Sequence, residues 1–132
     1  MHKKFSTKWL SSKQPRKQRK FIANAPLHVR RKFISSHLSK DLMKKYSRRS
    51  FPLRKGDSIK VMTGNFRGKT GKIEEVDYKN IKVYIDTISF VKKDGTKSRV
   101  PLHPSNLLIQ ELALDDKKRR HAIERTMQVN KK

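Results

Sequence analysis

A chain of 132 residues with a formal net charge of +24 and 33% apolar residues has the length of one small domain. So large a positive charge is self-repelling unless a polyanion neutralises it, which makes nucleic acid the leading partner class. The absence of cysteine excludes disulfides and thiolate metal sites, and no apolar run approaches the ~18 residues of a membrane span. The basic N-terminus also lacks the apolar stretch of a secretory signal. We therefore expect a cytoplasmic protein without membrane insertion.

The positive charge is concentrated in the first fifty residues. Residues 1–50 hold sixteen Lys and Arg against one acid, whereas residues 51–114 hold twelve against seven. Residues 115–132 hold seven against three. The middle segment therefore has the charge balance of an ordinary globular domain, and the N-terminal segment does not.

Residues 1–25 are predicted to form a basic, extended arm. The run S-S-K-Q-P-R-K-Q-R-K lies among scattered aromatic residues, Phe5, Trp9 and Phe21, without a helical or strand period. So few apolar side chains cannot offset the entropy lost on ordering. We expect the arm to be disordered alone and ordered against a polyanion, and the alternative is a solvated, nonspecific basic tail.

Two short helices are predicted in residues 26–50. Leu27, Ile34 and Leu38 recur on one helical face, which predicts a first helix. Ser39 is placed to cap a second helix over the next seven residues. The apolar stripe is narrow, so we expect these helices to pack on the following domain or on a partner.

Residues 51–112 are predicted to form a β-domain organised around a glycine-rich hairpin. Alternation over residues 58–62 predicts one strand, and residues 70–76 the returning one. Three glycines in eight residues indicate a backbone that reaches positive φ or approaches a partner closely. Cations interleave with them, so the loop offers backbone N–H groups and positive charge together: Gly64, Gly68 and Gly71 stand among Arg67, Lys69 and Lys72.

The remainder of this domain has the pattern of further short strands. Residues 81–85 alternate apolar and polar side chains, and Asp94-Gly95 is a strong hairpin signal. Residues 96–102 and 107–109 complete about five strands. We expect these strands to form a small antiparallel barrel, because closing the sheet removes its unpaired edges.

The C-terminal residues 113–132 are predicted to form a short, basic helical tail. Two aspartates precede four cations there, which is the charge order of a helix N-terminus.

No catalytic or metal-binding pattern is present in the sequence. The five histidines have no zinc-like spacing, and no carboxylate cluster joins them. Surface or RNA-facing positions are the simpler interpretation of these histidines. The loop at 64–71 lacks the G-K-[ST] ending and following helix of a nucleotide-binding loop. We expect no enzyme activity, no metal and no cofactor.

The candidate RNA contacts divide by role. Cations of the arm neutralise phosphates without reading sequence, while those of the helices and the hairpin add charge on ordered elements. Trp9, Phe21 and Phe66 are candidates for stacking on unpaired bases, although Phe66 could instead pack on the domain. The turn at 103–106 groups three hydrogen-bonding side chains, or is an ordinary turn. The predicted RNA-binding residues are Arg16, Lys17, Arg19, Lys20, His28, Arg30, Arg31, Lys32, Arg48, Arg49, Asn65, Phe66, Arg67, Lys69, Lys72, His103, Ser105 and Asn106.

Several segments resemble a known family. The run V-M-T-G-N-F-R-G-K-T-G-K-I is similar to a KOW motif, a strand–loop–strand unit of ribosomal proteins and transcription elongation factors. Six further segments stand in order: P-R-K-Q-R-K (15–20), N-A-P-L-H-V-R-R-K (24–32), L-S-K-D-L (38–42), K-Y-S-R-R-S-F-P-L-R-K-G-D (45–57), D-G-T (94–96) and H-P-S-N (103–106). Over residues 13–112 the chain resembles the archaeal and eukaryotic form of a large-subunit ribosomal protein family, numbered twenty-four in bacteria and twenty-six in eukaryotes.

The resemblance implies a mainly β protein with an SH3-like antiparallel KOW barrel at 51–112, flanked by the arm (1–25), the short helices (26–50) and the tail (113–132). It also implies a constituent of the large ribosomal subunit, bound to its rRNA early in assembly, near the 5′ region of that RNA and the polypeptide exit tunnel. Neighbouring large-subunit proteins and factors docking at the tunnel are the further partners implied, and DNA is not expected. The alternative is a KOW-containing transcription elongation or regulatory module, although such factors usually carry another domain where this chain has a basic arm.

Overall fold

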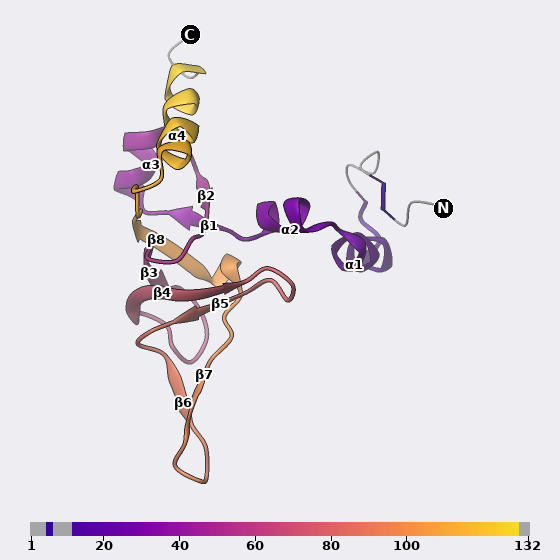
Figure 1. Ribbon diagram of the computed structural model, residues 1–132, viewed down its shortest axis with the longest axis vertical. Coiled ribbons are helices and arrows are strands. Elements are labelled where there is room, and N and C mark those ends of the chain that lie inside the picture. Colours follow the sequence, from indigo (N-terminus) through magenta and orange to yellow (C-terminus); the bar gives the residue numbers. More distant parts are fainter. Residues whose placement is uncertain (1–4, 7–11, 130–132) are drawn as a thin grey trace.

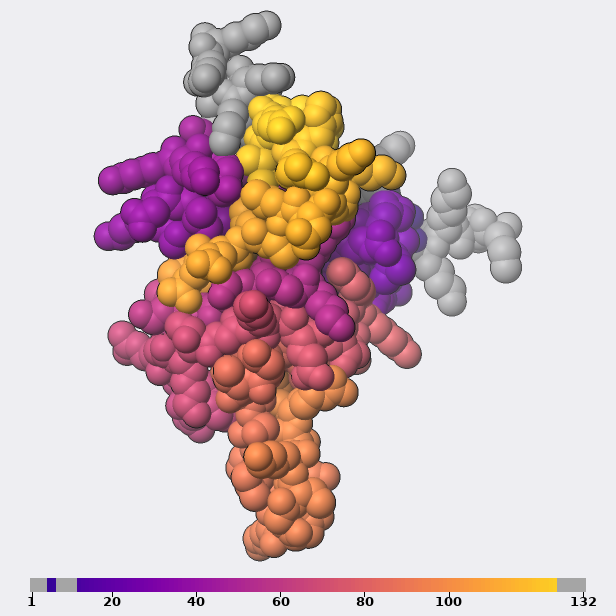
Figure 2. All heavy atoms as spheres, turned by 60° about the vertical axis from the view of Figure 1, so that its left-hand side comes forward, coloured from indigo at the N-terminus to yellow at the C-terminus, as the bar shows by residue number. Residues whose placement is uncertain are grey.

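The computed structural model describes residues 5–6 and 12–129, which form a β-rich body with helical extensions (Figure 1). Helices α3 (Lys40–Tyr46) and α4 (Lys117–Val129) lie side by side at one end (Figures 1 and 2). The hairpin of β6 (Ser89–Val91) and β7 (Lys97–Arg99) projects from the other end. Helices α1 (Pro15–Asn24) and α2 (Leu27–Phe33) reach out sideways (Figure 1). The elements are α1 (Pro15–Asn24), α2 (Leu27–Phe33), β1 (Ser35–Leu38), α3 (Lys40–Tyr46), β2 (Ser50–Pro52), β3 (Ser58–Val61), β4 (Thr70–Asp77), β5 (Lys82–Ile85), β6 (Ser89–Val91), β7 (Lys97–Arg99), the 3₁₀ turn η1 (Pro104–Asn106), β8 (Leu107–Glu111) and α4 (Lys117–Val129).

The body is one bent sheet with the strand order β2-β1-β8-β3-β4-β5, and β6 pairs with β7 alone. The mainly β, SH3-like fold class is therefore confirmed. Two details differ from the predicted barrel. Strand β1 runs parallel to β8, whereas the other pairs are antiparallel. Among the described strands, no pairing joins the two edges β2 and β5, so hydrogen bonds do not close the sheet into a barrel.

The core is made by alternate residues of the central strands. Ile59 and Val61 of β3, with Leu107 and Ile109 of β8, are buried, while their strand neighbours are exposed or half-buried. In β4 the alternation fails after Ile73 because the register shifts there, between Ile73 and Glu75. Such a bulge places two residues of one strand against one of the next. At this bulge the two adjacent acids, Glu74 and Glu75, are both exposed, although neighbouring residues of a regular strand face opposite sides.

One predicted helix is shorter than expected because part of it is a strand. Helix α2 ends at Phe33, and β1 follows with Leu38 fully buried. β1 pairs with β2 on one side and β8 on the other, and Leu53 N donates to Ile34 O at 3.0 Å. These distant partners satisfy the backbone of β1, so tertiary pairing overrides the helical spacing of Leu27, Ile34 and Leu38. β2 (Ser50–Pro52) likewise begins at the last residue of the segment 26–50, in which only helices were predicted.

The arm also differs from its prediction, since α1 is a regular helix. Proline stands in its first turn, where a missing N–H is harmless, and Lys, Arg, Gln and Ala are good helix formers. Local propensity therefore accounts for a helix that no apolar period indicated. Phe21 packs between the rings of Phe5 and Phe33, with centroids 4.8 and 5.9 Å away. Trp9 lies outside the described residues.

The second predicted helix is confirmed as α3. The Ser39 side chain accepts a hydrogen bond from Leu42 N, and Ser39 O accepts one from Met43 N at 2.8 Å. Asp41 in the first turn complements the positive end of the helix. Ser47 ends the helix in the left-handed conformation, with φ of 50°.

The C-terminal helix α4 is attached to the body through a buried ion pair. Arg119 donates from Nη1 to Oδ1 of Asp57 and from Nη2 to Oδ2, both at 2.7 Å. Asp57 also accepts from the backbone N of Arg54 and of Ala113, and its side chain is 0% exposed. The Arg119 guanidinium lies 5.3 Å over the Phe51 ring. The predicted helical tail is thus a packed element, joined to residues early in the β-domain.

Asp116 lies immediately before α4 and links this helix to the loop before β3. Its Oδ1 accepts from Lys118 N at 2.8 Å, and its Oδ2 forms an ion pair with Arg54. The hydrogen bond from Arg54, followed by that from Lys118 N, holds the pKa of Asp116 below its usual 3.8. The helix start predicted from the charge order of residues 115–120 is therefore confirmed, because the Asp116 side chain caps the first turn of α4 through Lys118 N.

Candidate nucleic-acid interface

The loop between β3 and β4 is shaped by its own backbone. Gly64 and Gly68 have φ of 89° and 87°, which are conformations that residues with a Cβ rarely adopt. Gly68 N donates to Val61 O at 2.8 Å, and Val61 N donates to Lys69 O at 2.9 Å, so the base of the loop is paired. The side chains of Asn65, Arg67 and Lys69 in the loop, and of Lys72 in β4, are exposed.

Gly71 serves a different purpose from the loop glycines. A Cβ at Gly71 would come within 2.6 Å of Asp86 Oδ1 and Ile85 Cγ2, and would also clash with Thr87 Oγ1. β4 therefore approaches the end of β5 too closely for a side chain. Of the two reasons expected for a glycine-rich run, positive φ applies at Gly64 and Gly68, and close approach applies at Gly71.

We expect Gly68→Val to destabilise the protein by about 1–3 kcal/mol, because a β-branched residue is strained at this positive φ. Nothing lies within 4 Å of a Cβ at Gly68, so the loss comes from backbone strain and not from a clash. Denaturant unfolding measures it. Thr70→Val is the matched control, since Thr70 is exposed in a regular strand. Equal stability of the two variants would show that the loop tolerates another conformation.

The turn at 103–106 lies against this loop. Met62 N donates to Asn106 O at 2.8 Å, which joins the end of β3 to η1. Within the turn, His103 Nδ1 lies 2.8 Å from Ser105 Oγ, and Ser36 Oγ donates to Pro104 O from β1. His103, Ser105 and Asn106 are exposed. The fold thus brings together two predicted parts of the site, 62–69 and 103–106, that are about forty residues apart.

Phe66 is half-buried and packs against the hydrophobic core, with Lys69 Nζ lying 5.2 Å over its ring. Of the two roles considered for Phe66, its position favours packing on the domain. Phe21 is also half-buried, between two other phenylalanine rings. Both rings are therefore occupied by protein contacts, and the exposed groups near them are cationic.

The four arm cations are displayed on α1. Arg16, Lys17, Arg19 and Lys20 are all exposed, and α1 contains neither an acidic nor a buried residue. On α2, His28, Arg31 and Lys32 are exposed as well. Both helices therefore carry exposed basic residues, and no carboxylate pairs with them among the described residues.

Arg30 and Arg48 have structural contacts that the sequence did not indicate. Arg30 donates to three backbone carbonyls, of Ala23 and Lys79 at 2.6 Å and of Ala25 at 2.9 Å. It thereby ties the α1–α2 connection to the β4–β5 turn. Arg48 lies 5.1 Å over the Phe51 ring and is half-buried, while Arg49 is exposed. Arg30 is positioned to hold the arm, whereas His28 and Lys32 on α2 are exposed.

Sequence reasoning missed two residues beside Arg31. The Arg31 guanidinium lies 5.5 Å over the ring of Tyr78, and Arg54 lines the same pocket. Forty-seven positions separate Arg31 from Tyr78, so no local spacing could connect them.

No group of His, Cys, Asp and Glu in the described part of the chain could hold a metal ion. No helix among the described residues is long and apolar enough to cross a membrane.

The fold and its charged surface define a small, strongly basic, β-rich protein with a KOW-like hairpin. A family model that describes the eukaryotic ribosomal proteins L26 and their archaeal counterparts matches residues 12–126. The chain belongs to this family. The match continues into α4, beyond the 13–112 stretch that carried the resemblance. The chain is also similar to the large ribosomal subunit protein uL24 of Methanosphaera stadtmanae, with 54% identity over 114 residues, 86% of this chain and 97% of the relative.

Proposed function

We propose that this chain is a structural, non-enzymatic constituent of the large ribosomal subunit that binds large-subunit rRNA. It joins the RNA early in assembly, near its 5′ region and the polypeptide exit tunnel, and works in the cytoplasm as part of the ribosome. Family membership and the 54% identity to a large-subunit protein support the ribosomal role. The position on the RNA rests on the family resemblance.

The observation that carries RNA binding is the composition of α1. This helix of ten residues has four exposed cations, no acid and no buried side chain. Isolated helices of this length are marginal in water. α1 buries none of its residues, and Phe21, which contacts Phe5 and Phe33, is only half-buried. A phosphate backbone supplies both the counter-charge and the surface to order against.

The remaining predicted contacts extend this surface from the arm to the body. His28, Arg31 and Lys32 continue it on α2, and Arg49 follows on the loop before β2. The β3–β4 loop and the η1 turn add exposed cations and hydrogen-bonding groups on a backbone that is internally paired. Phosphates contacted here fix the orientation of the domain, while those on α1 add affinity. On the projecting β6–β7 hairpin, Phe90 and Val91 are exposed and suit a neighbouring large-subunit protein or a factor at the tunnel.

Sedimentation of cell lysates tests this function. We expect the tagged chain to sediment with large ribosomal subunits and to leave them only at high salt. Replacing the four α1 cations with Gln should release it at lower salt. A control variant loses the same four charges from α4, at Lys117, Lys118, Arg120 and Arg125, which are exposed. Absence from the large subunit, or equal release of both variants, would argue against the proposal.

Limited proteolysis gives a second prediction. In the free protein, trypsin should cut within α1 well before it cuts the sheet, because a helix without buried residues opens easily. Bound rRNA should protect the same sites, since ordering is coupled to binding. If α1 of the free protein survives as long as β3 and β8, its order does not depend on RNA.

A further inference from the structure

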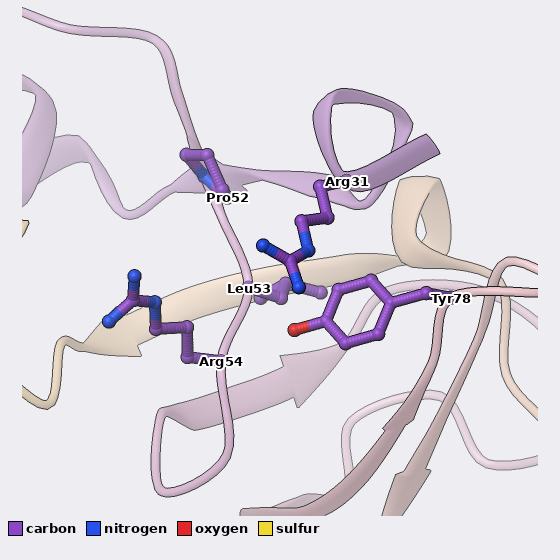
Figure 3. Close-up of a pocket in the computed structure, with 5 residues that line it drawn as sticks. All are labelled: Arg31, Pro52, Leu53, Arg54 and Tyr78. Carbon is purple, nitrogen blue, oxygen red and sulfur yellow. The ribbon is translucent and has the colours of Figure 1, made fainter. Parts of the chain in front are cut away.

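A pocket of about 290 Å³ opens where α2 meets the sheet (Figure 3). It lies between α2, the segment that follows β2 and the β4–β5 turn. Its floor is apolar, because Leu53 is buried there beside Pro52. The residues that line it are Arg31, Pro52, Leu53, Arg54 and Tyr78, and none of them is acidic.

The polar groups of the pocket enter from two sides. The guanidinium of Arg31 and the hydroxyl of Tyr78 are directed into the space over Leu53, and Arg54 stands on the far side (Figure 3). Arg31 has no carboxylate partner in the described part of the chain. Arg54 is bound to Asp116 through Nη1, and no other hydrogen bond of its guanidinium is found among the described residues. Arg31 and Tyr78 thus offer donors to a ligand over Leu53, whereas the guanidinium of Arg54 is directed away from them (Figure 3).

The wall formed by α2 is held in place before any ligand arrives. Arg30 donates from Nη1 to Lys79 O at 2.6 Å, and Lys79 is the residue next to Tyr78. On the other wall, the ion pair with Asp116 orients Arg54. Because the neighbours of the pocket fix both arginine-bearing segments, a ligand would meet a largely preformed site.

We propose that this pocket holds one unpaired nucleotide of the rRNA, an inference that rests on the rRNA binding proposed above. The base stacks on the planar guanidinium of Arg31 over the apolar floor, within reach of the hydroxyl of Tyr78. Single-stranded RNA is recognised by bases that leave the helix and stack on aromatic rings or guanidinium planes.

Two variants separate the geometry of the pocket from its charge. Arg31→Lys keeps the positive charge but loses the planar fork, and Tyr78→Leu keeps an apolar wall but removes the ring and the hydroxyl. We expect each to weaken binding to the large-subunit rRNA of the source organism by about five- to tenfold at fixed salt. Arg120→Lys, an equal exchange at an exposed position of α4 outside the proposed interface, should stay within about twofold. Thermal melting confirms that each variant is folded.

Chemical probing of the RNA 2′-hydroxyls supplies the decisive readout. In the wild-type complex, one unpaired nucleotide should be protected that becomes reactive in the Arg31→Lys and Tyr78→Leu complexes, while the other protections persist. Suppose that the wild type binds its rRNA more tightly than a non-ribosomal RNA, but both variants bind this rRNA with the wild-type affinity and the wild-type protections. That result overturns the pocket proposal and leaves the proposed function standing. If the wild type binds a non-ribosomal RNA of equal length as tightly, the proposed function falls, and the pocket falls with it.

Discussion

Replacing Arg119 with methionine is expected to lower the free energy of unfolding by about 3–5 kcal/mol. The substitution leaves the carboxylate of Asp57 in the core without its cation, since the side chain of Asp57 is fully buried and that of Arg119 is 3% exposed. Methionine retains much of the packing against Phe51 but none of the hydrogen bonds to Asp57, Pro52 O or Ala113 O. Urea unfolding of the free protein measures the loss.

The adjacent residue provides the control for this experiment. Arg120 is exposed, so Arg120→Met should change stability by less than about 0.5 kcal/mol. The double variant Arg119→Met, Asp57→Leu removes both charges and should recover part of the loss, because well-packed apolar groups can replace a buried ion pair. A stability of Arg119→Met equal to that of Arg120→Met would mean that α4 does not anchor the body.

The second large effect concerns salt. If about six to ten phosphates are neutralised, affinity for large-subunit rRNA should fall by about 10³–10⁵ between ~50 and ~200 mM salt. Each Lys or Arg bound to a phosphate releases counterions, and this release is less favourable when salt is already present in the solution. Filter binding over a salt series measures the slope of affinity against salt on logarithmic scales.

The α1 cations should account for a defined share of that slope. Changing Arg16, Lys17, Arg19 and Lys20 to Gln should make it shallower by about three, since each phosphate contact contributes ~0.7–0.9. Removing the four exposed α4 cations provides the comparison and should leave the slope unchanged. An affinity that hardly varies with salt would contradict an electrostatic interface.

Local patterns predicted those elements whose partners are close in the chain. The alternation of Ile59 and Val61, the capping serine of α3 and the Asp94-Gly95 turn were all recognisable because each depends on a few adjacent residues. β1 was missed, since its strand character comes from β8, about seventy positions later. α1 was missed for the opposite reason: its helix follows from local propensity, whereas the prediction relied on an apolar period.

The same division applies to the site. Most of the cations proposed for the site are exposed, because charge alone keeps most Lys and Arg at the surface. Their individual partners were not predicted. Arg30 bonds backbone carbonyls, Arg119 bonds Asp57, and Arg31 lies over Tyr78. Each of these contacts joins elements that only the folded topology brings together.

The parallel pairing of β1 with β8 also sets the order of events during synthesis. The basic helices leave the translating ribosome first, but β1 remains without its central neighbour until residues 107–111 have been made. Asp57 must wait still longer, for the arginine at position 119. Such sequence-distant contacts make folding slow, since much chain must be ordered before they form. The nascent chain is thus an exposed polycation before it has a folded body, and it becomes compact only when translation is nearly complete.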